Sequence, residues 1–196
     1  MYEPDEDSYL LIDALNMETS FLAEQLKPKS VLEVGVGSGA VINSLWLMLR
    51  RKNFKELSSC LFKGTDINPA AIECASKVRD LNKTTVDFIL TERSDGYLEN
   101  LDGKVDVLIF NPPYVETSEE ELLEAQSKRG IEASCSGGKE GIQLLTEMLP
   151  SFEKMLSSAG VMYLLLISDN LRVINLLEQM GFRWTVVMKR EVLGEN

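Results

Sequence analysis

The sequence places a short polar motif, Asn111-Pro112-Pro113-Tyr114, directly after the apolar run Val105–Phe110. That run has the length and β-branched content of a buried strand. Proline fixes φ and has no N–H, so two consecutive prolines end a strand abruptly. We therefore expect a stiff corner that presents two hydrogen-bond acceptors, the Asn111 side-chain oxygen and the Pro112 carbonyl.

These two acceptors could hold both hydrogens of a flat NH2 group. A carboxamide nitrogen is a poor nucleophile because its lone pair is delocalised into the carbonyl, and holding both hydrogens lets the lone pair be turned toward an electrophile. The exocyclic amine of adenine fits the same geometry, and Tyr114 would form an aromatic wall against either group. The motif alone leaves amide and adenine open, and a plain Pro-Pro turn explains it about as well on local grounds.

The composition narrows the chemistry available to this corner. The chain has no histidine, which excludes Ser-His-Asp and Cys-His nucleophile systems and histidine metal sites. Cys60, Cys74 and Cys135 are far apart in the sequence, which predicts reduced, structural cysteines. We therefore expect a site that works by positioning and aimed dipoles, with no metal of its own.

The formal net charge of −11 argues against a nucleic-acid partner. Nucleic-acid binders normally carry a basic face, because contacts with phosphates supply most of their affinity. The one visible basic cluster is residues 50–52 with Lys55, and cations at that place also suit the end of a helix. The charge makes a nucleic-acid substrate less favoured without excluding it.

The length of 196 residues predicts one domain, residues 1–196. The longest apolar run, residues 161–167, is far shorter than the roughly 20 residues of a membrane span, so we expect no membrane segment. The opening residues show no basic-then-apolar leader, which favours the cytoplasm, with the nucleus as a further compartment.

Predicted strands and helices alternate along the chain. The predicted strands are Ser30–Val34, 61–65, 86–91, Val105–Phe110, 161–167 and 182–189. The first predicted helix begins at Asp5. The other predicted helices cover Ala40–Arg51, 70–81, 141–156 and 170–180. This alternation predicts an α/β fold with a single doubly wound, mostly parallel sheet. We interpret the polar stretch 116–126 as a solvated acidic face or lid.

A glycine-rich turn, Gly35-Val36-Gly37-Ser38-Gly39, follows the first predicted strand and precedes a helix. Such glycines let the backbone pass close under a ligand, although a turn made only for packing also favours glycine. Asp66, at the tip of the second predicted strand, is suited to accept both hydroxyls of a ribose. A helix N-cap is an equally good local explanation of Asp66.

The turn formally matches a dinucleotide fingerprint, but two features favour S-adenosylmethionine over NAD. Glu33 lies two residues before the first glycine, where a carboxylate would repel a pyrophosphate and would suit an amino-acid ammonium group. Asp66 follows Gly39 by 27 residues, later than the usual ~20.

Together, the segments 33–39, 66–69 and 111–114 resemble class I S-adenosylmethionine-dependent methyltransferases of the HemK (PrmC) glutamine methyltransferase group, which have a Rossmann-like fold. The opening segment 2–8 and the segment 130–133 with Gly137 and Gly138 resemble the short eukaryotic and archaeal branch. The resemblance covers essentially the whole chain. The motif at 111–114 is shared with adenine methyltransferases, whereas its combination with the opening segment is much more specific.

The resemblance implies roles for particular residues. It implies cofactor contacts by Ser8, Glu33, Gly35, Asp66 and Asn111, with Asp66 at the ribose. Glu92 and Arg93 lie where the family places its adenine contacts, although the family more often has aspartate at the first position, and Asp95 competes for the role. The catalytic motif would be Asn111, Pro112, Pro113 and Tyr114.

The resemblance also implies an acceptor and a partner. The acceptor would be the glutamine of the Gly-Gly-Gln loop in a class I peptide chain release factor, and the partner a small zinc-binding activator subunit in a heterodimer. Adenine in nucleic acid and the lysine amine of a protein remain alternative acceptors, and a non-catalytic module that binds cofactor and partner is a third reading. The family usually has a further strand after the segment matching 190–196, which leaves open whether the sheet lacks one.

Overall fold

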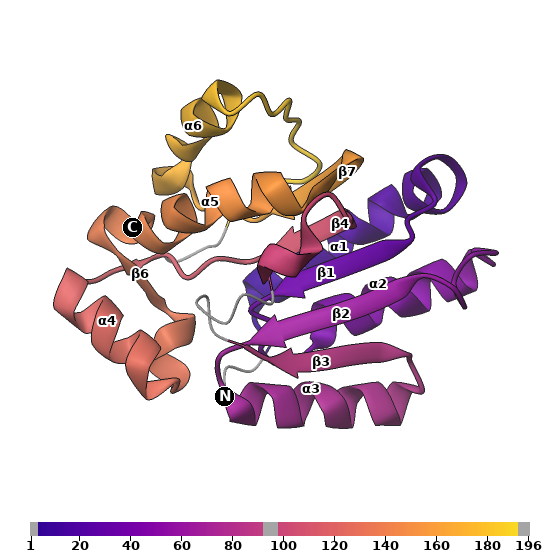
Figure 1. Ribbon diagram of the computed structural model, residues 1–196, viewed down its shortest axis with the longest axis horizontal. Coiled ribbons are helices and arrows are strands. Elements are labelled where there is room, and N and C mark those ends of the chain that lie inside the picture. The colour runs from indigo at the N-terminus through magenta and orange to yellow at the C-terminus, as the bar shows by residue number, and fades with distance from the viewer. Residues whose placement is uncertain (1–3, 92–97, 192–196) are drawn as a thin grey trace.

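The computed structural model describes residues 4–91 and 98–191, and its centre is a five-stranded sheet in the order β3-β2-β1-β4-β7 (Figure 1). In that order the strands are Val86–Leu90, Leu61–Asp66, Ser30–Val34, Val105–Phe110 and Leu156–Leu164. Every pair of neighbours in this sheet is parallel. The sheet confirms the predicted α/β, doubly wound fold.

Helices cover both faces of the sheet because each interior strand is apolar on both sides. In β4, Val107 and Ile109 join a buried cluster with α1 and α2, whereas Leu108 and Phe110 join a second cluster with α5 and α6. The helices are α1 Glu6–Ser20, α2 Ala40–Arg51, α3 Pro69–Asn82, α5 Gln143–Met155 and α6 Val173–Gln179, with a π-helical turn at Phe21–Leu26 and 3-10 turns at Leu98–Leu101 and Ser168–Asn170.

The order of the strands reverses beside β1. The chain runs from β1 to β2 and β3 on one side, and then to β4 and β7 on the other. Glu33 and Val34 at the end of β1 pair in register with Ile109 and Phe110 at the end of β4. Open α/β sheets bind ligands outside the carboxyl ends of the strands at such a reversal.

A smaller unit lies beyond those carboxyl ends (Figure 1). It consists of β5 Val115–Glu116, α4 Glu119–Lys128, β6 Ser136–Gly138 and the 3-10 turns Ile131–Ser134 and Lys139–Gly141. The strands β5 and β6 pair in parallel. The pairing of Val115 with Ser136 and of Glu116 with Gly138 fixes the two strands relative to each other.

The segment 116–126, interpreted above as a polar face or lid, contains most of helix α4. Ser118 and Glu121 form a capping box, in which each side chain accepts a hydrogen bond from the backbone N–H of the other residue. Leu122 and Ala125 are buried on its inner side. The excess of glutamate obscured this apolar spacing, although Ser-x-x-Glu was a readable helix start.

The predicted strand at 182–189 is wrong: among the described residues this segment forms no strand. Trp184 and Val186 are 49% and 64% exposed. Arg190 pairs instead with Asp13 at 2.7 Å and with Glu6 at 3.6 Å on α1. A β-branched run forms a strand only when the edge strand of a sheet pairs with its backbone. Here Arg190 holds the end of the segment against α1.

The other predicted bounds differ less. The strand predicted at 161–167 is β7, which begins at Leu156 and ends at Leu164, and the helix predicted at 170–180 shortens to Val173–Gln179. No helix in the described parts of the chain is both long and apolar enough to cross a membrane.

Candidate active site

A single pocket at the carboxyl ends of β1, β2 and β4 gathers most of the residues that the sequence singled out. We call its two walls the sheet side and the corner side. The sheet side comprises residues 4, 5, 7 and 8 of the N-terminal segment, 33–38, 40, 41, 65–68, 71 and 91. The corner side comprises residues 111–115, 126, 130, 131 and 133–135.

The glycine turn on the sheet side is tied to the next strand. The backbone N–H groups of Gly35 and Val36 both donate to the carbonyl of Thr65, at 2.8 and 3.0 Å. Gly35, Gly37 and Gly39 all have φ between 52° and 75°, which only glycine adopts at little cost. The turn therefore brings the backbone of its glycines to the wall of the pocket, and its contact with a ligand stays a prediction.

Asp66 joins this turn to the start of α3. One of its oxygens accepts the Gly37 N–H at 3.0 Å, and the other accepts the Asn68 N–H at 2.9 Å. The N-cap of α3 is Asn68, whose side chain accepts from Ala70 N–H. Asp66 is therefore not the helix cap, and it lines the pocket with a pKa raised by burial despite these backbone hydrogen bonds.

Glu33 is a buried carboxyl at the base of the sheet side. Its Oε2 accepts the Ile42 N–H of α2 at 3.0 Å. Burial raises the pKa of Glu33 to about 8; the Ile42 hydrogen bond lowers it in part, and the charge of Asp66 raises it further. A cation that binds beside Glu33 therefore stabilises the ionised form of its carboxyl group.

The pocket supplies no such cation from its own described residues. Its charged lining residues in those parts of the chain are Asp5, Asp7, Glu33 and Asp66, all acidic. A ligand carrying ammonium and sulfonium groups fits this wall, and a pyrophosphate does not. Asp5 is also the N-cap of α1, which agrees with the predicted start of the first helix.

Ser8, in the first turn of α1, also lines the pocket and is half-buried. Glu92 and Arg93, the predicted adenine contacts, and the competing Asp95 lie outside the described residues. Their neighbour Thr91 is buried and lines the sheet side. Its backbone N–H donates to the Asp66 carbonyl at 3.1 Å, which brings the end of β3 beside the predicted ribose site.

On the corner side, Asn111 presents an acceptor with no partner. Its Oδ1 is buried and has no hydrogen bond to any described part of the chain. Pro112 and Pro113 are buried around it, and β4 is held just before the corner by the Leu165 N–H, which donates to the Phe110 carbonyl at 3.2 Å. A buried, unpaired oxygen is costly unless a ligand donates to it.

The corner is held in place by the smaller unit. The Val115 N–H donates to the Cys135 carbonyl at 3.0 Å. Gly141, with φ of 67°, packs so closely that a Cβ there would collide with the Tyr114 carbonyl. The sequence indicated the glycine loop but not its task of fixing Tyr114.

Two side chains on the corner side, Gln126 and Ile131, have roles that the sequence did not indicate. Gln126 was placed in the polar stretch and Ile131 only within a resembling segment. The readable signal was the spacing of Leu122, Ala125 and Gln126, which lie on one side of a helix.

Residues 3–131 match the model of the methyltransferase small domain family. They cover the whole sheet side and the motif at the corner. The chain is 34% identical over 198 residues to the human methyltransferase HEMK2, covering all of this chain and 86% of that protein. The chain belongs to the HemK methyltransferase family.

Two other relatives agree with this assignment. The catalytic subunit mtq2 of the eRF1 methyltransferase from Schizosaccharomyces pombe is 31% identical, over all of this chain and 86% of its own length. A protein from Methanocaldococcus jannaschii that carries the name of an N5-glutamine methyltransferase is also 31% identical, over 88% of its length. This methyltransferase therefore uses S-adenosylmethionine, as the sequence predicted.

Solved structures agree on the fold alone. A ribosomal protein L11 methylase from Lactobacillus delbrueckii superposes with a TM-score of 0.57 at 18% identity, covering 90% of this methyltransferase and 72% of that chain. A class I methyltransferase from Listeria monocytogenes gives 0.52 at 19% identity. The Rossmann-like sheet is thus shared well beyond the HemK family.

Proposed function

We propose that this methyltransferase transfers a methyl group from S-adenosylmethionine to the side-chain amide nitrogen of the glutamine in the Gly-Gly-Gln motif of a peptide chain release factor. The observation that carries the proposal is the buried Oδ1 of Asn111, which is unpaired among the described residues and lies in the same pocket as a wall whose described charged residues are all acidic. The relatives named for glutamine and eRF1 methylation point to the same acceptor.

The corner can prepare an amide for attack. Asn111 Oδ1 accepts one amide N–H and the Pro112 carbonyl accepts the other, which turns the nitrogen lone pair toward the methyl carbon. The nitrogen forms a bond to that carbon, the carbon–sulfur bond breaks, and its electron pair stays on sulfur. The positive charge passes from sulfur to nitrogen, which then loses one N–H proton to water.

This chemistry needs no strong base before transfer, which suits a chain without histidine. The acidic wall would stabilise both cationic groups of the cofactor, and the product, which keeps the ammonium but not the sulfonium charge, would be attracted less strongly. The residues therefore bind and orient, and the cofactor supplies the reactive group.

An adenine acceptor is the second candidate, because its exocyclic amine also offers two N–H donors. The net charge of −11 and the acidic pocket lining oppose the approach of a polyphosphate chain. A lysine acceptor fits less well, because an amine nucleophile does not need two hydrogen-bond acceptors.

The test is methyl transfer from labelled S-adenosylmethionine to three acceptors: a release-factor domain with Gly-Gly-Gln, the same domain with that glutamine changed to alanine, and DNA. We expect label on the first only, mapped to the glutamine. Label on the alanine variant or on DNA would contradict the proposal.

A small zinc-binding activator subunit would complete the enzyme as a heterodimer. Support comes from β3, which is an edge strand of the sheet and leaves Leu90 45% exposed beside half-buried Phe88 and Ile89. An unpaired apolar edge can add a strand from a partner. Leu90→Glu should block co-purification with the subunit, whereas Leu81→Glu on exposed α3 should not; equal co-purification would contradict this edge as the interface.

The cytoplasm is the compartment we propose, with the nucleus as a further one. The three cysteines are free rather than joined in disulfides, which suits a reducing compartment. Imaging of the tagged full-length protein tests this, and secretion of the protein would contradict it.

A further inference from the structure

The polar side chains on the corner side differ in how their hydrogen bonds are satisfied. The Ser134 hydroxyl donates to the Ile131 carbonyl at 2.6 Å, and Cys135 lies 3.8 Å from the same hydroxyl. Asn111 Oδ1 has no hydrogen-bond partner in the part of the chain that the structure describes. The Gln126 carboxamide likewise has no hydrogen bond to any residue in the described parts of the chain. The corner side therefore holds one buried, unpaired amide oxygen, that of Asn111, and one half-buried carboxamide, that of Gln126, without a hydrogen bond to the described residues.

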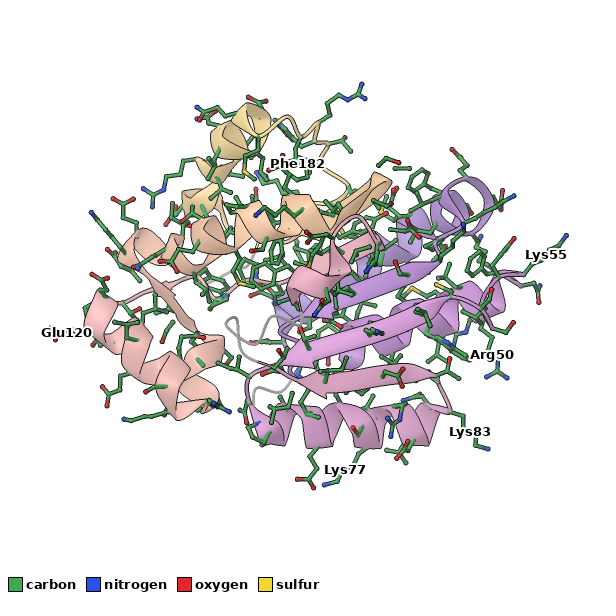
Figure 2. The ribbon with its side chains drawn as sticks, in the orientation of Figure 1. Arg50, Lys55, Lys77, Lys83, Glu120 and Phe182 are labelled. Carbon is green, nitrogen blue, oxygen red and sulfur yellow. The ribbon has the colours of Figure 1, made fainter. Side chains whose placement is uncertain are left out.

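Helix α4 directs Gln126 into the pocket. Leu122 and Ala125 are buried, and Gln126 follows Leu122 by one turn, so all three share the inner side of the helix. Glu120 lies on the opposite side and points away from the molecule (Figure 2). Gln126 is half-buried, so its carboxamide lies at the pocket wall, where a ligand can reach it.

The position of Gln126 is set before any ligand arrives. The capping box at Ser118 and Glu121 fixes the start of α4, with the Ser118 N–H donating to the Glu121 carboxylate at 2.8 Å. At the other end, the Arg129 N–H donates to the Ala125 carbonyl at 3.2 Å. A side chain on such a helix loses less conformational freedom on binding than one on an open loop.

An acceptor carboxamide has three sites to satisfy: two N–H donors and one carbonyl oxygen. Asn111 Oδ1 and the Pro112 carbonyl account for the two donors. The carbonyl oxygen then needs a donor, and leaving it buried without one would cost roughly ten- to a hundredfold in binding. The described carboxamides of the corner side are Asn111 and Gln126, and no hydrogen bond within the described residues is made by either NH2 group. Because Asn111 faces the acceptor with its oxygen, Gln126 is left as the carboxamide that can donate.

We propose that Gln126 donates a side-chain N–H to the carbonyl oxygen of the acceptor amide and thereby selects a carboxamide over an amine. This inference rests on the proposed function. It adds a specificity residue from α4 to the motif at the corner. A lysine side chain has no carbonyl to satisfy Gln126, so it would leave that amide unpaired.

The test compares Gln126→Glu with the wild-type protein, measured as kcat/KM for a Gly-Gly-Gln release-factor domain at saturating cofactor. The substitution keeps the shape and removes the N–H donor. We expect a loss of about thirtyfold or more at pH 8, with cofactor affinity unchanged. The loss should shrink as the pH falls toward 5.5, because a protonated carboxyl can donate its O–H in place of the N–H.

Two further variants separate this role from a structural one. Glu120→Gln makes the reverse exchange on the outward side of α4 and should leave kcat/KM unchanged at every pH. Gln126→Ala should lose about tenfold with no recovery at acid pH, because it has no group that can regain a donor. A Gln126→Glu protein as active as wild type, or a loss that does not change with pH, would overturn the inference.

The same experiment keeps the two proposals apart. If the wild-type protein does not label the glutamine, the proposed function fails. If the wild-type protein labels it and the Gln126 variants match wild type, the proposed function stands and only the role of Gln126 is wrong.

Discussion

The two walls of the pocket differ in how their polar groups are satisfied. On the sheet side, Glu33 and Asp66 already accept backbone N–H groups, at 3.0 Å from Ile42 and at 3.0 and 2.9 Å from Gly37 and Asn68. On the corner side, Asn111 Oδ1 accepts no hydrogen bond from residues 4–91 or 98–191. The carboxylates of the sheet side are therefore held in place before the cofactor arrives, whereas the Asn111 oxygen is left for the acceptor to pair.

This difference follows from where each wall is built. The sheet side lies at the ends of parallel strands, where backbone N–H groups of turns and helix starts converge on a carboxylate. The corner follows two prolines, which supply carbonyls but no N–H groups. The two acceptors at this corner suit an acceptor group that brings its own hydrogens, and substitutions on the two walls should therefore have separable effects.

The largest expected effect is that of Asn111→Ala, which removes the unpaired acceptor from the corner side. Transfer should fall by about a hundred- to a thousandfold, because the amide loses one of its two positioning contacts. Cofactor affinity should stay within about tenfold, as measured by calorimetry alongside single-turnover transfer.

The matched substitution on the sheet side is Asp66→Ala. It should weaken cofactor binding by about tenfold or more while leaving transfer at saturating cofactor much closer to wild type. If Asn111→Ala abolished cofactor binding, or Asp66→Ala left it unchanged, the separation of the two walls would be wrong.

Glu33 on the sheet side should make both the stability of the protein and its affinity for the cofactor depend on pH. The pKa of Glu33 is raised from an ordinary value of 4.5 to about 8, so the cofactor-free protein holds a proton there that the unfolded chain has released. Stability of the free protein should therefore fall as the pH rises from about 4.5 to 8. Cofactor ammonium favours the ionised carboxyl, so affinity should rise by up to about tenfold per unit between pH 6 and 7.5.

Titration calorimetry in buffers of different ionisation enthalpy checks this, because binding should release close to one proton near pH 7. Glu33→Gln should bind more weakly and lose most of the pH dependence. Affinity that stays flat across this range in the wild-type protein would show that Glu33 is already ionised in the empty pocket.

The smallest expected effect is that of Gly141→Ala, which acts on the corner side through packing. A Cβ at Gly141 would meet the Tyr114 carbonyl at a residue whose φ is 67°, so the corner must shift. We expect about a tenfold loss in kcat/KM for the acceptor, with cofactor affinity unchanged. Gly103→Ala is the control, because Gly103 has φ of 66° and no atom within 4 Å of the added Cβ.

Gly103→Ala should thus cost only backbone strain, on the order of 1–2 kcal/mol, with normal transfer. Thermal unfolding of both variants should separate the cost of backbone strain, which both share, from the cost of the collision with Tyr114, which only Gly141→Ala has. Equal activities in the two variants would mean that the packing of Gly141 against Tyr114 does not position the corner.

The sequence predicted well where a contiguous segment carries its own signal. The strand and glycine turn around Gly35 and the strand before Asn111 were readable, because alternating or continuous apolar runs and Gly or Pro breaks are local properties. Helix α4 was missed, because its apolar residues are few among glutamates. The strand predicted at 182–189 was wrong, because an edge must accept it and Arg190 is paired with α1 instead.

The sequence by itself therefore determined the fold class, the family and the two motifs that face each other across the pocket. Only the tertiary structure decided that Asn68 rather than Asp66 caps α3, that the Asn111 oxygen is left unpaired, and that Gln126 faces the pocket from α4. The reason is physical: strand and turn signals arise between neighbours in the chain. Satisfaction of a buried polar group depends on which distant residues the fold brings to it.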